Sequence, residues 1–146
     1  KITQGLCKIK LKLAKKLYVG NLNAKRDWGH AADYVKAQWL ILQQKKPDDF
    51  VIATGKQFSV REFVNIAAKN LGININWVGK GVNEKGIDKA TGKIIIKVGK
   101  KYFRPTEVDS LRADFSKAKK DLNWSPKKNI NDLIDEMIEY ELSINN

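Results

Sequence analysis

The stretch DDFVIATG, residues 48–55, constrains the fold more than any other part of this sequence. Residues 50–53 form an unbroken apolar run, and Thr54 and Gly55 close it with residue types that favour turns. A strand with one solvated face alternates apolar and polar residues, whereas a strand covered on both faces is continuously apolar. We therefore expect a strand at about residues 50–54 within a parallel sheet, which places the chain in the α/β class.

Segments with helical and strand periodicity alternate along the rest of the chain. Ser59 and Glu62 have the spacing of a capping box, which predicts where one helix begins. The pattern predicts an α/β fold of mixed short strands and helices, and no linker or internal repeat divides residues 1–146. The expected helices cover residues 2–13, 27–44, 59–71, 116–122 and 131–143, the expected strands cover residues 16–22, 73–78 and 94–96, and residues 79–92 are expected to form a loop.

The net charge of +12 would suit a protein that binds nucleic acid. However, the 24 lysines are spread from Lys1 to Lys128, mostly singly or in pairs, and no regularly spaced aromatic residues accompany them. This distribution favours a solvated lysine surface over a nucleic-acid interface. Nucleic acid is therefore not the expected partner, although the basic surface would attract an anionic small molecule.

No apolar run approaches the roughly 20 residues that a membrane-spanning helix needs, and no signal-peptide pattern is visible. We therefore expect a cytoplasmic protein with no membrane partner. Cys7 is the single cysteine, which excludes a disulfide within the chain and gives no support for a metal site.

Arginine is scarce in this chain, which has only four arginines beside its 24 lysines. Arg26 lies where an expected strand gives way to a helix, and Arg104 precedes Pro105, which holds the backbone extended. A planar guanidinium can bind two oxygens of a phosphate at once, which a lysine ammonium cannot do with fixed geometry. Keeping arginine at these two junctions suggests an anion site. The alternatives are an ion pair with Asp27 or Glu107, or an exposed arginine without a role.

The residues near Arg26 are expected to serve the fold rather than to bind a ligand. Asp27 and Asp33 are expected to serve the start of a helix, where a carboxylate meets the positive end of the helix dipole. His30 is the only histidine, and a packed or capping role is expected for it rather than a catalytic one. The tryptophans are expected mainly in the core; they are Trp28, Trp39, Trp77 and Trp124.

Five segments taken in order resemble the C-terminal part of the GDP-mannose 4,6-dehydratase family, which belongs to the extended short-chain dehydrogenases/reductases. The resemblance runs over essentially all 146 residues. An R-D-aromatic motif followed by R-P-x-x is shared by many nucleotide-sugar epimerases and dehydratases, and the longer strings NLNAKRDWGHA and YFRPTEVD point to the GDP-mannose family. The segments are GNLNAKRDWGHAADYV, DDFVIATG, FSVREFV, YFRPTEVD and KAKKDLNWSP.

The resemblance implies that residues 1–146 are the GDP-sugar-binding domain of a longer enzyme. It implies that Arg26 and Arg104 grip the diphosphate of GDP-mannose from two sides and that Glu107 accepts hydrogen bonds from the ribose hydroxyls. It also implies that Lys1 faces the diphosphate. The strand at about residues 50–54 would join a Rossmann sheet contributed by a missing N-terminal half.

The resemblance also implies an activity that these residues cannot perform alone. The complete enzyme would convert GDP-mannose to GDP-4-keto-6-deoxymannose with NADP as its cofactor. No G-x-x-G-x-x-G or G-x-G-x-x-G occurs in the chain, and no Tyr-x-x-x-Lys pair occurs either, since the residues four after the tyrosines are Leu22, Gln38, Thr106 and Ile144. We therefore expect no catalytic residue, no bound NADP and no dehydratase activity from these 146 residues alone.

The expected partners follow from the same resemblance. Phe50, Val51 and Ile52 would each lose about 1.5–3 kcal/mol of burial without a covering sheet. We therefore expect self-association as a homo-oligomer, or a need for the missing half. The preferred interpretation is one portion of a dehydratase, either a fragment or one piece of a split protein. The alternative is a module without chemistry that binds a sugar nucleotide or nucleic acid.

Overall fold

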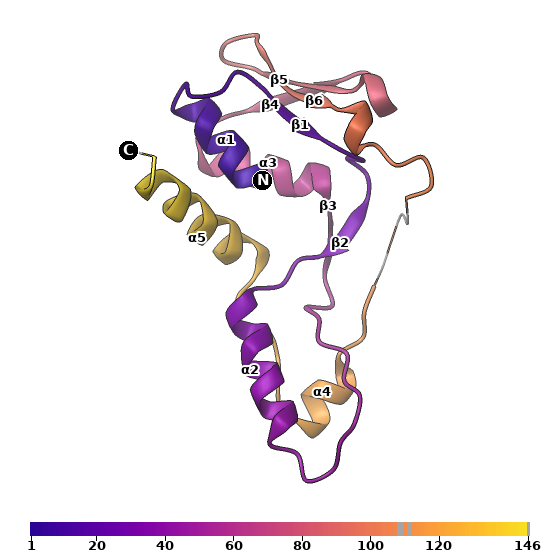
Figure 1. The fold of residues 1–146 in the computed structure, drawn as a ribbon. Helices are drawn as coiled ribbons and strands as arrows, with labels where there is room; N and C mark the ends of the chain where they lie inside the picture. The colour runs from indigo at the N-terminus through magenta and orange to yellow at the C-terminus, as the bar shows by residue number, and fades with distance from the viewer. Residues whose placement is uncertain (108–109, 111, 146) are drawn as a thin grey trace.

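The computed structural model describes residues 1–107, 110 and 112–145, and it has the expected α/β composition (Figure 1). Short strands and helices are mixed along the chain, with single turns of 3-10 helix η1 (Gly81–Asn83) and η2 (Lys100–Tyr102) between some of them. The other elements are α1 (Ile2–Lys10), β1 (Leu17–Val19), β2 (Lys25–Asp27), α2 (Ala31–Leu42), β3 (Gln57–Ser59), α3 (Val60–Asn70), β4 (Ile75–Val78), β5 (Lys85–Asp88), β6 (Ile94–Val98), α4 (Ser116–Asp121) and α5 (Ile130–Ser143).

The larger sheet has the strand order β1-β6-β5-β4. β1 and β6 pair in parallel, with Leu17 opposite Ile96, and the other two pairs are antiparallel. Residues 79–92 were expected to form a loop, and this expectation is wrong for β5, which pairs with both β4 and β6. β5 reads Lys-Gly-Ile-Asp, so it carries no apolar alternation of its own and depends on the pairing provided by β4 and β6.

The main core lies between this sheet and the helices α1, α3 and α5 (Figure 1). Leu6, Val64 and Ile134 are fully buried there, one from each helix. The expected capping box of α3 is confirmed, since Ser59 Oγ accepts from Glu62 N and the Ser59 N–H donates to the Glu62 carboxylate. The Ser59 N–H and the Ser59 hydroxyl both donate to the Glu62 carboxylate, which holds the pKa of Glu62 below its ordinary value.

A second, smaller core joins α2 to α4 at the far end of the molecule (Figure 1). Its buried residues are Ala37, Ala118, Leu122 and Trp124. Leu40 and Ile41 of α2 pack against this core, but Trp39, which was expected in a core, does not. Val35 is 61% exposed, Trp39 52% and Leu42 81%, because the small Ala37 and the buried Asp33 occupy the inner face instead. Trp39 therefore does not join a core.

The apolar run at residues 50–53 is not paired as a strand among the described residues, so its expected pairing with a sheet outside residues 1–146 stays a prediction. Val51 is 51% exposed, while Phe50 and Ile52 pack partly against the second core. A strand needs a neighbour that accepts and donates its backbone hydrogen bonds. Among the described residues, no strand pairs with this run. The parallel pairing among the described strands is that between β1 and β6.

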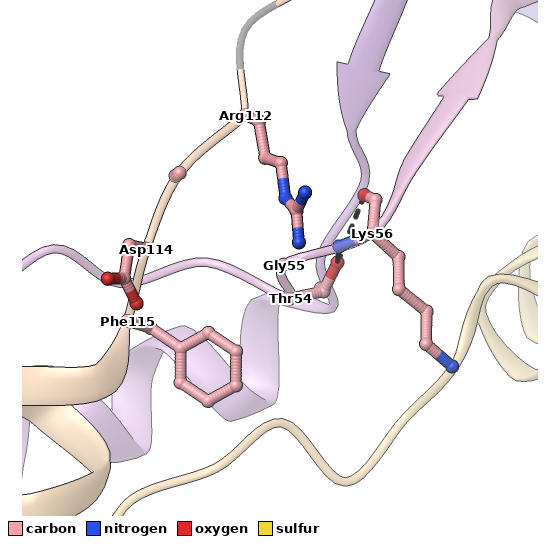
Figure 2. Close-up of a pocket in the computed structure, with 7 residues that line it drawn as sticks. Thr54, Gly55, Lys56, Arg112, Asp114 and Phe115 are labelled. Carbon is pink, nitrogen blue, oxygen red and sulfur yellow. Dashed lines mark hydrogen bonds between the residues drawn. The ribbon is translucent and has the colours of Figure 1, made fainter.

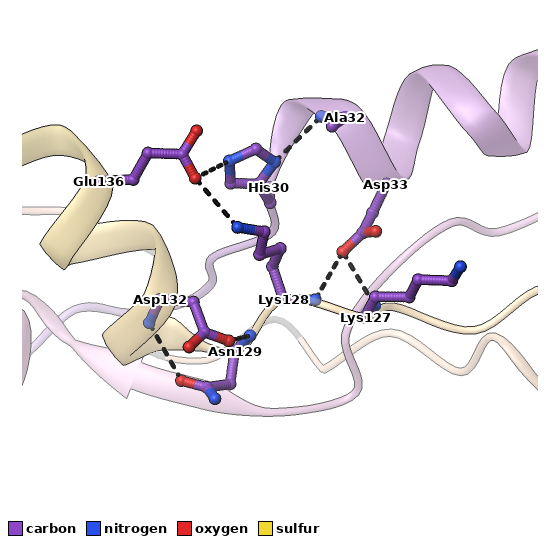
Figure 3. Close-up of polar contacts among 8 residues, drawn as sticks. All are labelled: His30, Ala32, Asp33, Lys127, Lys128, Asn129, Asp132 and Glu136. Carbon is purple, nitrogen blue, oxygen red and sulfur yellow. Dashed lines mark hydrogen bonds and ion pairs between the residues drawn. The ribbon is translucent and has the colours of Figure 1, made fainter. Parts of the chain in front are cut away.

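A polar network joins the start of α2 to the start of α5 (Figure 3). One oxygen of the buried Asp33 carboxylate accepts the N–H groups of Lys127 and Lys128, each at 2.9 Å. The Asp33 carboxylate therefore holds a distant backbone segment, rather than serving only the helix in which it lies. His30 caps α2, as expected, and its other ring nitrogen lies 3.1 Å from a carboxylate oxygen of Glu136.

The described helices are all too short or too polar to cross a membrane.

Candidate functional site

A two-stranded ribbon of β2 and β3 positions the Arg-Asp-Trp motif. Arg26 lies opposite Phe58 in the antiparallel register of this ribbon. The three side chains of the motif contact three different segments of the chain. Trp28, for example, donates from its indole nitrogen to the Phe58 carbonyl at 3.3 Å and packs against Phe63 at 4.5 Å between ring centroids.

Arg26 contacts Glu107, which lies far along the chain. The Arg26 Nη2 donates to Glu107 Oε1 at 2.5 Å, and the Arg26 Nη1 donates to the Lys25 carbonyl at 2.6 Å. The two charged side chains are half-buried, with 31% of Arg26 and 17% of Glu107 exposed. The structure therefore brings together two of the predicted binding residues, and it does so through an ion pair, one of the alternatives that the sequence left open.

Asp27 secures the turn at Thr54 and Gly55. Its carboxylate accepts the Thr54 N–H at 2.9 and 3.1 Å, the Thr54 hydroxyl at 2.7 Å and the Gly55 N–H at 2.8 Å. Gly55 has φ +72°, a conformation that glycine adopts without strain. The expectation that Asp27 serves the start of α2 is therefore wrong, because its oxygens are used by a turn that sequence reasoning did not connect with it.

Arg104 is fixed through its backbone. Asn21 donates to the Arg104 carbonyl at 2.7 Å and accepts the Arg104 N–H at 2.8 Å. The Arg104 residue itself is exposed, and within the described part of the chain no hydrogen bond or ion pair of its guanidinium is seen. The last two residues of the YFRPTEVD segment, at 108–109, lie outside the described residues.

Lys1 lies at the start of the same region. Its ammonium group is 3.3 Å from the centroid of the Tyr102 ring. A side chain at Gly20 would place its Cβ only 2.4 Å from the Tyr102 carbonyl oxygen, so glycine is required for this close approach. Lys1 and Arg104 are therefore placed near the same loop, but neither contacts the Arg26–Glu107 pair within the described residues.

Two small cavities meet at Gly20. One, of about 200 Å³, is lined by residues 20–24, Glu84 and Glu107 among others. The other, of about 250 Å³, is largely apolar and is lined by Lys1, Trp28 and Met137 among others. The loop at residues 20–24 thus lines the cavity that contains Glu107, and Gly20 also borders the cavity that Lys1 lines.

A larger cavity of about 540 Å³ lies beside the turn that Asp27 secures (Figure 2). Thr54, Lys56 and Arg112 line it, together with Asp114 and Phe115. Sequence reasoning missed this site. The scarcity of arginine was the available signal, and it applied to Arg112 as much as to Arg26.

The described residues show no cluster of metal ligands and no glycine-rich turn at the start of α3. No group of three or more potential metal ligands gathers among them. The helix that follows directly on a strand is α3, and its N-terminus is closed by the Ser59 and Glu62 side chains rather than by a glycine-rich turn, so it does not fit a dinucleotide pyrophosphate. Burial and the charges of Asp27 and Asp33 raise the pKa of Tyr34, opposite to what a tyrosine base needs.

Comparison with known proteins identifies relatives of this chain. The family model described as GDP-mannose 4,6 dehydratase matches residues 1–137. GDP-mannose 4,6 dehydratase of Drosophila melanogaster is 48% identical over 144 residues, which are 99% of this chain and 36% of the fly protein. The protein of that name from Cricetulus griseus is 50% identical over 144 residues, covering 99% of this chain and 39% of the relative. The chain thus spans well under half of the length of these relatives.

Solved structures with low sequence identity share the fold. RMD from Pseudomonas aeruginosa, complexed with NADPH, superposes with a TM-score of 0.76 at 16% identity, covering 98% of this chain and 41% of that one. The dTDP-glucose 4,6-dehydratase of Bacillus anthracis, in complex with NAD, has a TM-score of 0.71 at 18% identity and covers 99% and 40%. Because the family model matches nearly the whole chain, this protein belongs to the GDP-mannose 4,6-dehydratase family.

Proposed function

We propose that residues 1–146 are the GDP-sugar-binding portion of a GDP-mannose 4,6-dehydratase, which converts GDP-mannose to GDP-4-keto-6-deoxymannose. Relatives of that name align with 99% of the chain. The observation that carries the proposal is the contact between Arg26 and Glu107, which come from segments 81 positions apart; Glu107 also lines a cavity. A cation and a carboxylate side by side match a ligand that has a diphosphate next to ribose hydroxyls.

In this proposal the ion pair prepares Glu107 for its ligand. Arg26 engages Oε1 of Glu107, and this contact orients the half-buried carboxylate. A carboxylate accepts several hydrogen bonds, so Glu107 can hold a ribose hydroxyl while it contacts Arg26. The planar guanidinium of Arg26 then lies next to the diphosphate and contributes charge-assisted hydrogen bonds to it.

Arg104 and Lys1 supply further positive charge in this proposal. The Asn21 side chain fixes the Arg104 backbone, so the exposed guanidinium can swing toward the ligand while its Cα stays in place. Lys1 rests on the Tyr102 ring at the other side of Gly20. Charge on both sides of the loop would favour a diphosphate over a neutral sugar.

The remaining length of the relatives would supply what these residues lack. We propose that a Rossmann half outside residues 1–146 holds NADP and the catalytic groups, and that residues 50–54 pair with its sheet. The same half, or a second copy of the chain, would cover the exposed Val35, Trp39 and Val51. Residues 1–146 alone would have no dehydratase activity. Assembly into a homo-oligomer stays a prediction.

A thermal-shift experiment separates this proposal from the alternative of a basic nucleic-acid-binding module. GDP and GDP-mannose are expected to raise the melting temperature of the wild-type chain, because a ligand that binds only the folded state stabilises it. Arg104→Ala should lose most of that increase, whereas Lys69→Ala, which removes an exposed lysine of α3, should keep it. Stabilisation by short DNA that falls steeply with salt, with no effect of GDP, would instead support nucleic-acid binding.

A further inference from the structure

Arg61, near the start of α3, is the centre of a polar network that the proposed roles above do not use. Its guanidinium forms an ion pair with Glu84, in which Nη1 donates to Oε1 and Nη2 donates to Oε2 at 3.1 Å. Nη2 also donates to Asn23 Oδ1 at 2.8 Å. The guanidinium carbon lies 5.0 Å from the centroid of the Trp77 ring. The side chains are mostly buried, with 23% of Arg61 and 10% of Glu84 exposed.

The first turn of α3 also holds the loop at residues 20–24 through its backbone. The Arg61 N–H donates to the Leu22 carbonyl at 2.9 Å, and the Val60 N–H donates to the Ala24 carbonyl at 3.1 Å. Asn23, between these two anchored residues, is the one that the Arg61 side chain holds. Three successive residues of the loop are thus bound to two successive residues of one helix.

This loop is the wall of the cavity that contains Glu107. Residues 20–24 line the cavity of about 200 Å³, and Glu84, the ion-pair partner of Arg61, lines it too. On the other side of the loop, Asn21 holds the backbone of Arg104. A shift of the loop would therefore alter the cavity and the position of Arg104 together.

We propose that Arg61 is a positioning residue, which acts through Asn23 and Glu84 to hold residues 20–24 in the shape that binds the nucleotide. This inference rests on the proposed GDP-sugar site but concerns a residue that does not touch the ligand. A guanidinium is needed because it donates to both oxygens of Glu84 and to Asn23 while it lies over the Trp77 ring. The compact ammonium of a lysine cannot reproduce this planar set of contacts.

The test uses the 146-residue chain with Arg61→Lys, which keeps the charge, and Asn23→Ala, which removes one bond of the network. Hydrogen–deuterium exchange without nucleotide reports on the loop itself. The Val60 and Arg61 N–H groups donate to the loop carbonyls of Ala24 and Leu22, so exchange of these two amides is expected to accelerate on the order of tenfold in Arg61→Lys. Lys69→Ala on the same helix serves as the control and should leave exchange of the Val60 and Arg61 amides unchanged.

GDP titration by calorimetry reports on the consequence for binding. Arg61→Lys should weaken GDP binding about tenfold, Asn23→Ala should weaken it less, and Lys69→Ala should bind like the wild type. Wild-type affinity in Arg61→Lys would overturn the positioning role and leave the proposed function standing. If the wild type itself fails to bind GDP, the proposed function fails. Exchange alone then decides whether Arg61 holds the loop. Unchanged exchange in Arg61→Lys overturns this role of Arg61, and faster exchange supports it.

Discussion

Replacing Arg26 by alanine is expected to lower the affinity of the chain for GDP-mannose by roughly 10- to 100-fold. A hydrogen bond to a charged group contributes about 1.5–3 kcal/mol, and about 1.4 kcal/mol corresponds to a tenfold change in affinity. The loss has a second cause, because Glu107 would no longer be oriented by the 2.5 Å contact with Arg26. Isothermal titration calorimetry of the wild type and the variant measures the difference.

Two further variants separate the ligand contact from the ion pair. Arg26→Lys keeps the charge but loses the planar fork, so we expect it to weaken binding as well. Glu107→Gln keeps the size of the side chain and removes the ion pair. We expect it to bind the ligand more weakly because its contact with the ribose hydroxyls is weakened. If Arg26→Ala lowered the melting temperature but left the affinity for GDP-mannose unchanged, Arg26 would serve only the fold.

Replacing Asp27 by alanine is expected to lower the free energy of unfolding by about 3 kcal/mol. The change leaves the Thr54 and Gly55 N–H groups without their acceptor at a half-buried place, and each such loss costs about 1–3 kcal/mol. Part of this cost is recovered because water can reach the turn. Urea unfolding monitored by circular dichroism gives the midpoint urea concentration and the slope, from which the change in the free energy of unfolding is obtained.

The matched controls for Asp27 lie in the same region of the chain. Asp27→Asn keeps one carbonyl oxygen and should lose less stability than Asp27→Ala. Asp49→Ala removes an exposed carboxylate shortly before the turn and should stay within about 0.5 kcal/mol of the wild type. An equal effect of Asp27→Ala and Asp49→Ala would show that the Asp27 carboxylate does not hold the turn.

Local features of the fold could be predicted because they depend on neighbouring residues. The capping box of Ser59 and Glu62 is an interaction over a few positions, and it is present as expected. The equivalent cap of α5, where Asn129 and Asp132 play these parts, was missed because the helix was expected to begin later. Periodicity alone places such a boundary only within a few residues.

Features that depend on distant partners could not be read from the sequence. The run at residues 50–53 is apolar enough for a buried strand, but it lacks a neighbouring strand among the described residues. The strand β5 shows the reverse, since its own sequence is a poor strand and its two neighbours determine its structure. The inner face of α2 also depends on a distant partner, because Asp33 turns inward to meet the backbone of Lys127 and Lys128.

In the candidate site, too, the sequence indicated some residues but not the distant partners that they contact. Scarcity of arginine drew attention to Arg26 and Arg104, but it could not show that Arg26 meets Glu107. The same signal applied to Arg61, whose network with Glu84 depends on the pairing of α3 with residues far along the chain. Composition can therefore suggest which side chains matter, whereas their partners follow only from the fold.

The most direct test of the central claim is to map GDP-mannose onto the ¹⁵N-labelled chain by amide chemical shifts. If Arg26 and Glu107 form the nucleotide site, the shifts that change on titration should concentrate at residues 20–27 and 103–107, and the same amides should not respond to mannose alone. Saturable binding whose shift changes lie elsewhere, or the absence of any change at millimolar GDP-mannose, would contradict the assignment of this chain as the sugar-nucleotide-binding portion.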